Sequence, residues 1–193
     1  MTPKGSKNKG SSFEREVSKL LDDWWKVPSG TFYRSKLSGG SNEPGDITPR
    51  LVGNNSSLWW PFAVECKHHK DLKFLQLFES LKYKDGPLIL QWWKQITDDV
   101  KDMCKWRLLI FKGNNTPILI AFTPTEWVDS FIVPPIAKYV TSKNYFDSIT
   151  PDLQDSFIYD SASYKNVLYI CTWKEFSSKI TKDALMQIKE DNQ

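Results

Sequence analysis

The strongest constraint on the fold of this chain is Asp46 followed, across a gap, by the alternating segment at residues 62–67. Side chains alternate between the two faces of a strand, so Ala63, Glu65 and Lys67 are predicted to share one face. The opposite, buried face would carry Phe62, Val64 and Cys66. The sequence therefore predicts a strand whose working face holds an acid and a lysine.

Asp46 can lie beside Glu65 if the two segments pair as an antiparallel hairpin. Facing residues in such a hairpin have a constant index sum, and this register puts the midpoint inside residues 53–57, a turn-prone stretch. Pro49 and Pro61 fall almost opposite each other, and neither can donate a hydrogen bond to a ladder. The expected hairpin is therefore bulged or splayed in its middle.

Two carboxylates and a lysine on one strand face fit a magnesium-dependent hydrolytic site. Mg²⁺ binds through one or two carboxylates, with water and substrate phosphate in its remaining positions. Such an ion lowers the pKa of a bound water, and a lysine can orient that water or stabilise the developing charge. The alternative is that Asp46 is a turn residue and that Glu65 and Lys67 lie on a solvated strand face. Because the pattern is short and common, the pattern alone favours this alternative.

Length and composition predict one soluble globular domain with a core, and the length leaves room for an appendage. The chain has 193 residues, of which 40% are hydrophobic and 25% are charged. Its net charge of +3 is too small to indicate nucleic acid by itself. Local charge is more informative, because Lys4, Lys7 and Lys9 precede any acidic residue. Residues 1–10 are predicted to form a flexible basic arm, which serves either phosphate contacts or solubility.

The cysteines and the hydropathy pattern favour an intracellular, cytoplasmic protein. Cys66, Cys104 and Cys171 are odd in number and far apart, so neither a disulfide framework nor a zinc site is indicated. No apolar run approaches the length of a membrane span, and no signal peptide opens the sequence. We therefore expect a reducing compartment and no membrane partner.

Residues 11–25 are predicted to form a helix, because apolar residues recur there at helical spacing. The apolar positions are Phe13, Val17, Leu20, Leu21 and Trp24. Ser11 and Glu14 form a capping-box pattern at the predicted start of this helix. Glu14 therefore has two interpretations, a helix cap or a further metal-binding carboxylate, and the pattern alone favours the cap.

A strand is predicted at residues 31–37, and a small, flexible loop at residues 38–42 leads from it towards Asp46. The loop could close over a phosphate backbone or serve as a plain linker. Arg34 would emerge from the strand near this loop, either as a phosphate clamp or as an ordinary surface arginine.

The segment after the Glu-x-Lys strand carries weaker signals. His68 and His69 lack the second ligand pair of a zinc site, although His69 would share a face with Lys67 and could contact DNA. Residues 70–89 are predicted to form a lysine-rich amphipathic short helix and loop.

A second helix is predicted at residues 88–105. Its buried stripe would consist of Trp93, Ile96, Val100, Met103 and Cys104. Gln91, Gln95 and Asp98 would form a neighbouring polar stripe. Gln95 could contact a phosphate or a water, but its spacing alone favours a solvated helix face.

The rest of the sequence predicts secondary structure but offers no candidate catalytic or binding residue. Residues 107–111 and 117–122 are short apolar runs, which are typical of strands buried on both sides. A helix-like segment at residues 125–132, a strand at residues 167–171 and a polar helix at the end complete the pattern.

The predicted order of elements resembles the core of the PD-(D/E)xK nucleases. That order is helix, strand, strand with Asp46, strand with Glu65 and Lys67, helix, strand, strand. Residues 9–16, which read KGSSFERE, resemble the KGxxxERE opening of archaeal-type Holliday junction resolvases.

A second resemblance comes from the middle of the chain. Gly86 and Pro87, the pattern WWKQ at residues 92–95, and the apolar run that ends at Lys112 resemble PD-(D/E)xK endonucleases encoded by bacteriophages. Together the two resemblances cover roughly residues 9–122.

The resemblance implies an α/β fold with a restriction-endonuclease-like core. A central mixed β-sheet would be flanked by helices at about residues 11–123, within a single nuclease domain at residues 11–193. Residues 124–193 would form a C-terminal extension, which exceeds the compact resolvase pattern.

Carried over residue by residue, the resemblance implies that Glu14, Asp46 and Glu65 are the metal-binding acids and that Lys67 is the catalytic lysine. The backbone carbonyl of Cys66 would be a further ligand, and Glu14 could act through water. The implied DNA contacts are Lys9, Arg15, Arg34, Ser38 and Gln95.

The resemblance also implies the activity, which would be endonucleolytic hydrolysis of a DNA phosphodiester with Mg²⁺, for which Mn²⁺ could substitute. A junction resolvase would act as a homodimer on four-way DNA junctions, in recombination and repair. The first alternative is another phage-type nuclease of the same fold with a repair, nicking or restriction-like role. The second is a non-catalytic DNA-binding protein, and the intact set of Asp46, Glu65 and Lys67 argues against it.

Overall fold

The computed structural model describes residues 3–35, 44–50, 58–70, 72, 77, 87–100, 105–122, 138–141, 156–161 and 166–191. The chain divides into two compact units, Met1–Thr116 and Pro117–Gln193, which are described separately below. The sequence places the end of the core near residue 123, and the division falls seven residues earlier, after residue 116. The prediction of a single nuclease domain stays a prediction.

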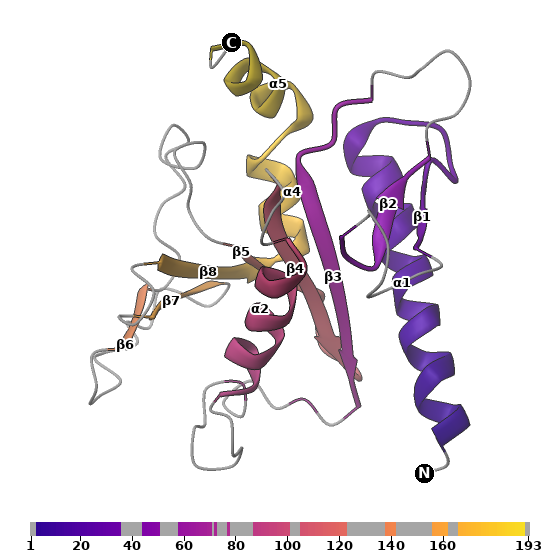
Figure 1. Cartoon of the computed structure of the whole chain (residues 1–193), viewed down its shortest axis with the longest axis vertical. Helices are drawn as coiled ribbons and strands as arrows, with labels where there is room; N and C mark the ends of the chain where they lie inside the picture. The colour runs from indigo at the N-terminus through magenta and orange to yellow at the C-terminus, as the bar shows by residue number, and fades with distance from the viewer. Residues whose placement is uncertain are drawn as a thin grey trace. The chain divides into compact units, whose positions relative to one another are not determined.

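The first unit is a mixed β-sheet with helices on both faces (Figure 1). Its elements are α1 (Pro3–Trp25), β1 (Phe32–Arg34), β2 (Ile47–Pro49), β3 (Phe62–His69), α2 (Leu88–Asp99) and β4 (Trp106–Gly113). β2 pairs antiparallel with both β1 and β3, whereas β4 runs parallel to β3 along its whole length. This arrangement confirms the predicted α/β fold.

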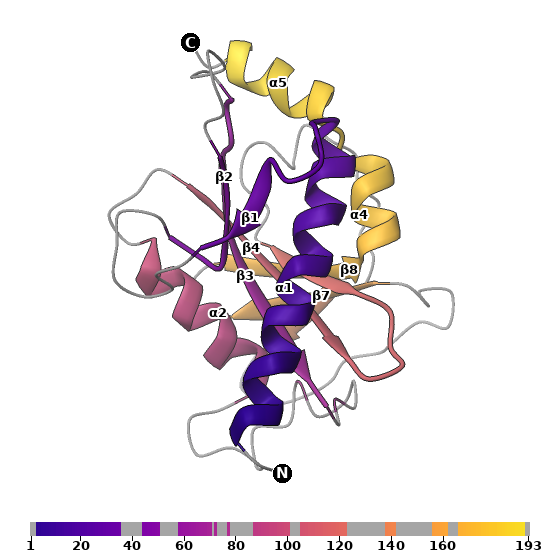
Figure 2. The ribbon, with the colours of Figure 1, turned by 90° about the vertical axis from the view of Figure 1, so that its right-hand side faces the viewer.

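Side chains alternate between the two faces of β3, and one helix packs against each face. Phe62 and His68 point towards α1, where their rings lie near those of Trp24 and Phe13. Ala63 points the other way and packs against α2 in a cluster with Ile96 and Val100. Figures 1 and 2 show β3 between the two helices. The working face of β3 is therefore covered by α2, so Ala63 is buried there as well.

Helix α1 begins at Pro3, eight residues before the predicted start at Ser11. Proline suits the first position of a helix because its φ angle is preset and its missing N–H is not needed there. The helix therefore extends through residues 3–10 of the predicted basic arm. It also places Glu14 in the helix interior, so the capping role that its spacing favours is wrong.

The antiparallel register of β2 and β3 is the predicted one. Ile47 pairs with Val64, and the same index sum puts Asp46 opposite Glu65. Only this pair is recorded between the two strands in the described residues, which agrees with the splay expected from Pro49. The predicted turn at residues 53–57 lies outside the described residues.

Helix α2 ends at Asp99, with Val100 as its C-cap, rather than near residue 105. Residues 101–104, which hold part of the predicted buried stripe, lie outside the described residues. The same is true of most of the amphipathic segment at residues 70–89, of the loop at residues 38–42 and of the helix-like segment at residues 125–132.

The second unit is also mixed in its strand directions. Its described elements are β5 (Leu119–Phe122), β6 (Lys138–Thr141), β7 (Ser156–Ser161), β8 (Asn166–Thr172), α4 (Trp173–Lys179) and α5 (Lys182–Asp191). β8 pairs antiparallel with β5 and β7, and β6 is parallel to β7. Thr172 caps α4, and Phe176 of that helix packs against Phe122. None of the helices in the described ranges combines the length and the apolar character that a membrane crossing requires.

Candidate active site

The first unit contains a polar pocket with a volume of about 320 Å³. Its lining residues come from α1, the start of β2, β3 and α2, and they are Glu14, Gly45, Asp46, Glu65, Cys66, Lys67, Gln95 and Asp99. The three acids and the lysine that the sequence predicts or leaves open, Glu14, Asp46, Glu65 and Lys67, are therefore joined by Asp99, which the sequence does not single out.

Asp46 sits where the pairing of β2 with β3 stops. Its backbone N–H donates to the carbonyl of Val64 at 2.7 Å, and its side-chain Oδ2 accepts from the backbone N–H of Cys66 at 2.9 Å. The Asp46 carboxylate thus accepts from the Cys66 N–H, where a continued β2 would have supplied a backbone carbonyl. Since the N–H and C=O of one strand residue point to the same side, the Cys66 carbonyl also faces this open edge.

Gly45 makes this close approach possible. Its φ of +89° lies in the left-handed region, and an added Cβ would lie 2.5 Å from the carbonyl oxygen of Val64. Only glycine fits such a position without backbone movement. The Gly-Asp pair is therefore a structural unit, in which the glycine lets the aspartate reach β3.

Glu65 is buried, with 2% of its surface exposed, so the solvated-face interpretation is wrong for this residue. The reason is the cover that α2 provides. Glu65 Oε1 lies 2.6 Å from Lys67 Nζ and accepts a hydrogen bond from Gln95 Nε2 at 2.7 Å. Lys67 Nζ in turn donates to Gln95 Oε1 at 2.8 Å. The three side chains form a closed triangle.

The acidic side chains of Glu14, Asp46 and Glu65 have raised pKa values, because burial and their mutual repulsion disfavour the charged forms. Burial, and then the charge of Asp46, raise the pKa of Glu65 to about 7. Burial also raises the pKa of Asp46, although the Cys66 N–H and Lys67 oppose this shift. The pKa of Glu14 is raised by burial and then by Asp46. A bound cation would relieve this repulsion.

Glu14 reaches the pocket from α1 and forms an ion pair with Arg34 Nε. Arg34 is 51% exposed, so part of its guanidinium faces solvent beside the pocket. Arg15 follows Glu14 on α1, is exposed and does not line the pocket. Of the other predicted DNA contacts, Lys9 belongs to α1 and Ser38 lies outside the described residues.

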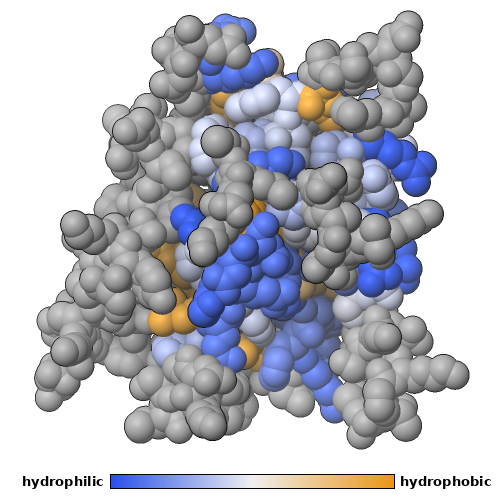
Figure 3. Space-filling view, viewed as in Figure 1, coloured by the Kyte–Doolittle hydropathy of each residue, from blue (hydrophilic) through white to orange (hydrophobic). Residues whose placement is uncertain are grey.

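Helix α2 contributes more to the pocket than its spacing predicts. Gln95 is exposed, as expected of a solvated helix face, but its side chain also bonds to both Glu65 and Lys67. Asp99, one turn later, lines the pocket, whereas Asp98 pairs with Lys94 on the helix surface. Figure 3 shows hydrophilic side chains gathered over the region where α2 lies in Figure 1. In the sequence, the i, i+4 spacing from Gln95 is the pattern that could have identified Asp99 as a residue on the same helix face.

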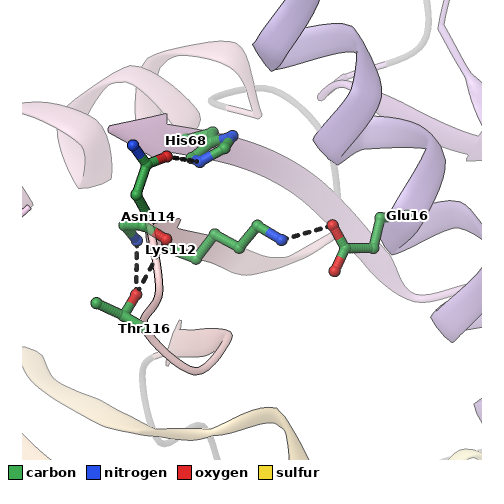
Figure 4. Close-up of polar contacts among 6 residues, drawn as sticks. Glu16, His68, Lys112, Asn114 and Thr116 are labelled. Atoms are coloured by element: carbon green, nitrogen blue, oxygen red, sulfur yellow. Dashed lines mark hydrogen bonds and ion pairs between the residues drawn. The ribbon is translucent and has the colours of Figure 1, made fainter. Parts of the chain in front are cut away.

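The opposite face of β3 carries a separate polar cluster, which Figure 4 shows. His68 Nε2 lies 3.2 Å from Asn114 Oδ1, and Lys112 Nζ of β4 lies 2.6 Å from Glu16 Oε2 of α1. Lys112 also lies over the ring of Phe13, 5.0 Å from its centroid. The Lys112 contacts tie α1 to the sheet, and the His68 ring packs near Phe13 of the same helix.

The donor set of the pocket fits a hard divalent cation. Within the described ranges, no three His, Cys, Asp or Glu side chains are arranged to hold a metal ion by themselves. Mg²⁺ needs only one or two carboxylates, with water and substrate filling its other positions. Asp46, Glu65 and the Cys66 carbonyl meet this requirement. Burial raises the pKa of the Cys66 thiol well above its usual range, so its sulfur is a poor ligand.

A mixed sheet flanked by helices, with an acid just before one strand and Glu-x-Lys on the next, defines the PD-(D/E)xK nuclease-like fold. A family model described as "Phage putative PDDEXK endonuclease" matches residues 5–187, and the chain belongs to this family. No curated protein and no solved structure matches the chain. The family supports a nuclease that acts on DNA, and the likeness to junction resolvases stays a resemblance.

Proposed function

We propose that this chain is a metal-dependent DNA endonuclease that hydrolyses a phosphodiester bond at the pocket of Asp46, Glu65 and Lys67. The observation that carries the proposal is the convergence of these residues, with raised pKa values for both acids, in one polar pocket. The family to which the chain belongs supports the same class of reaction.

The residues that would hold Mg²⁺ or Mn²⁺ are Asp46, Glu65 and the carbonyl of Cys66, with Glu14 acting through water. The bound ion supplies a water of lowered pKa and positive charge beside the scissile phosphate. Asp46 would also have a structural role. Its hydrogen bond to the Cys66 N–H holds Asp46 against β3, the strand that carries the other two ligands, Glu65 and the Cys66 carbonyl.

Lys67 is proposed to orient the attacking water and to stabilise charge on the phosphate. Its Nζ is held by Glu65 and Gln95, which leaves one of its three N–H donors for water or phosphate. Gln95 fixes the distance between the carboxylate and the amine. Such preorganisation matters because an in-line attack requires the water and the phosphorus to be aligned.

The proposed DNA contacts surround this pocket. Arg34 uses Nε for Glu14, so its remaining guanidinium N–H groups are available for a phosphate. Arg15, Lys9 and Ser38 are proposed as further phosphate contacts, and Gln95 as a contact for water or phosphate.

The proposed substrate is a four-way DNA junction, cut by a homodimer in recombination or repair. This finer proposal is supported by the likeness of residues 9–16 to the opening of archaeal-type junction resolvases. The alternative is another phage-type nuclease with a repair, nicking or restriction-like role; the matching family supports a phage endonuclease and no particular role.

A cleavage assay with Mg²⁺ or Mn²⁺ tests both levels of the proposal. The substrates are a four-way junction, a matched duplex, a flap and single-stranded DNA. Wild type is compared with Asp46→Asn, Lys67→Ala and the control Asp98→Asn, whose carboxylate pairs with Lys94 outside the pocket.

Paired symmetric nicks on the junction alone, lost in the first two variants and kept in the control, would support the resolvase proposal. Cutting of every substrate would retain the nuclease and reject the junction preference. DNA binding without any cutting would overturn the proposed activity and favour a non-catalytic DNA-binding protein. Light scattering in the same buffer reports whether the active species is a dimer.

A further inference from the structure

Asp99 is an acid of the pocket that neither its sequence pattern nor the proposed mechanism explains. It is the last residue of α2 and lies one helical turn after Gln95. Both residues line the pocket, and Gln95 contacts Glu65 and Lys67 directly. Residues four apart lie on the same helix face, so α2 presents Gln95 and Asp99 together towards β3.

The position of Asp99 is electrostatically unfavourable for the helix itself. The C-terminal end of a helix carries partial negative charge, which disfavours an acid there. No basic residue lies in the last turn of α2. Asp98 has an ion pair with Lys94, whereas Asp99 has no ion pair or hydrogen bond within the part of the chain that the structure describes.

The charge of Asp99 also acts on the two acids across the pocket. It lines the same pocket as Asp46 and Glu65, so its negative charge adds to theirs. Asp99 therefore adds repulsion at the helix end and in the pocket alike. Departures from stabilising patterns of this kind concentrate at functional sites, where a ligand offsets their cost.

We propose that Asp99 is a cation-binding residue of this pocket, which holds the divalent ion of Asp46 and Glu65 through a bound water. The inference rests on the proposed function and adds one residue to it. Mg²⁺ keeps several of its waters when it binds to protein. Because a water occupies about 30 Å³ in the liquid, the pocket of about 320 Å³ has room for a hydrated ion. The exposed carboxylate of Asp99 is suited to accept hydrogen bonds from such waters.

The test is Mn²⁺ binding to the full chain without DNA, measured by calorimetry and by the electron paramagnetic resonance of free Mn²⁺. Wild type is compared with Asp99→Asn, Asp98→Asn and Asp46→Asn. Loss of a hydrogen-bonding partner of a metal site typically weakens binding about 10–100-fold, and we expect roughly tenfold for Asp99→Asn. Asp98→Asn removes the same charge from the adjacent position outside the pocket and should change the affinity less than about twofold. Asp46→Asn should weaken Mn²⁺ binding more than either of the other two substitutions.

Thermal unfolding supplies a second readout, which separates the inference from simple misfolding. In EDTA, Asp99→Asn should unfold at or above the wild-type temperature, because the substitution removes repulsion. With Mn²⁺ present, the same variant should gain less stability than wild type.

Equal Mn²⁺ affinity in Asp99→Asn and wild type would overturn the inference and leave the proposed function intact, provided that Asp46→Asn still loses binding. Equal weakening in Asp98→Asn and Asp99→Asn would overturn it as well, because the effect would then be one of general charge. Absence of Mn²⁺ binding in wild type would overturn the proposed function and this inference together.

Discussion

Asp46 Oδ2 and the backbone N–H of Cys66 are joined by a 2.9 Å hydrogen bond, so a carboxylate takes the place of a strand at the edge of β3. This bond links fold and site, because the same aspartate is a proposed metal ligand. Structural and functional effects of Asp46 can therefore be separated by the choice of substitution.

Asp46→Asn should lose cleavage and Mn²⁺ binding while keeping nearly all of its stability, since the amide oxygen can still accept from Cys66 N–H. Asp46→Ala should lose the same functions and also about 1–3 kcal/mol of unfolding free energy, because a partly buried N–H is left without its acceptor. Urea unfolding of the two variants in EDTA measures the difference. Equal stability of both variants would contradict the structural role of the bond.

The pH dependence of stability should report Glu65. Its pKa of about 7 in the folded chain exceeds the usual value of 4.5, so the folded state holds the proton more tightly than the unfolded state. Without metal, the unfolding free energy should fall by about 3 kcal/mol as the pH rises from about 4.5 to 7. The raised pKa values of Asp46 and Glu14 act in the same direction.

Urea unfolding in EDTA at several pH values measures this slope, and Glu65→Gln should flatten it. Mn²⁺ affinity should rise over the same interval, because the cation competes with the proton. A wild-type stability that rises with pH between 5 and 7 would contradict this account of the pocket.

The sequence predicts the strand part of the site well, because strand geometry is regular. Alternation puts Glu65 and Lys67 on one face, and the constant index sum fixes the register that Ile47 and Val64 confirm. The mixed sheet with flanking helices was implied by the resemblance of the predicted element order to the PD-(D/E)xK core.

The helix contributions were less predictable, because they depend on packing between distant segments. Gln95 is compatible with either Asp98 or Asp99 on one stripe, since residues three and four apart both neighbour it. Only the way in which α2 crosses β3 selects Asp99 and buries Glu65. Glu14 was ambiguous for a local reason, because a capping pattern inside a long helix looks the same as one at its start.

Gln95 should act as a positioning residue for the Glu65–Lys67 pair. Gln95→Leu removes both hydrogen bonds of the triangle, and we expect kcat to fall about tenfold or more with little change in KM for DNA. Lys94→Met is the matched control, because Lys94 is the exposed neighbour that pairs with Asp98. Steady-state cleavage kinetics measure both constants. A rise in KM with unchanged kcat would instead make Gln95 a DNA contact.

Gly45→Ala should destabilise the chain far more than Gly30→Ala, although both glycines have similar positive φ values of +89° and +84°. At Gly30 an added Cβ meets nothing within 4 Å, so only the conformational cost of about 1–2 kcal/mol applies. At Gly45 the Cβ would lie 2.5 Å from the Val64 carbonyl oxygen, and this overlap should add about 1–3 kcal/mol. The overlap can be relieved only by moving Asp46 away from β3, so the Gly45 variant should also lose Mn²⁺ affinity, whereas the Gly30 variant should keep it. Urea unfolding and Mn²⁺ titration of the two variants provide the comparison, and equal losses in both would show that the close approach of Gly45 to Val64 does not position Asp46.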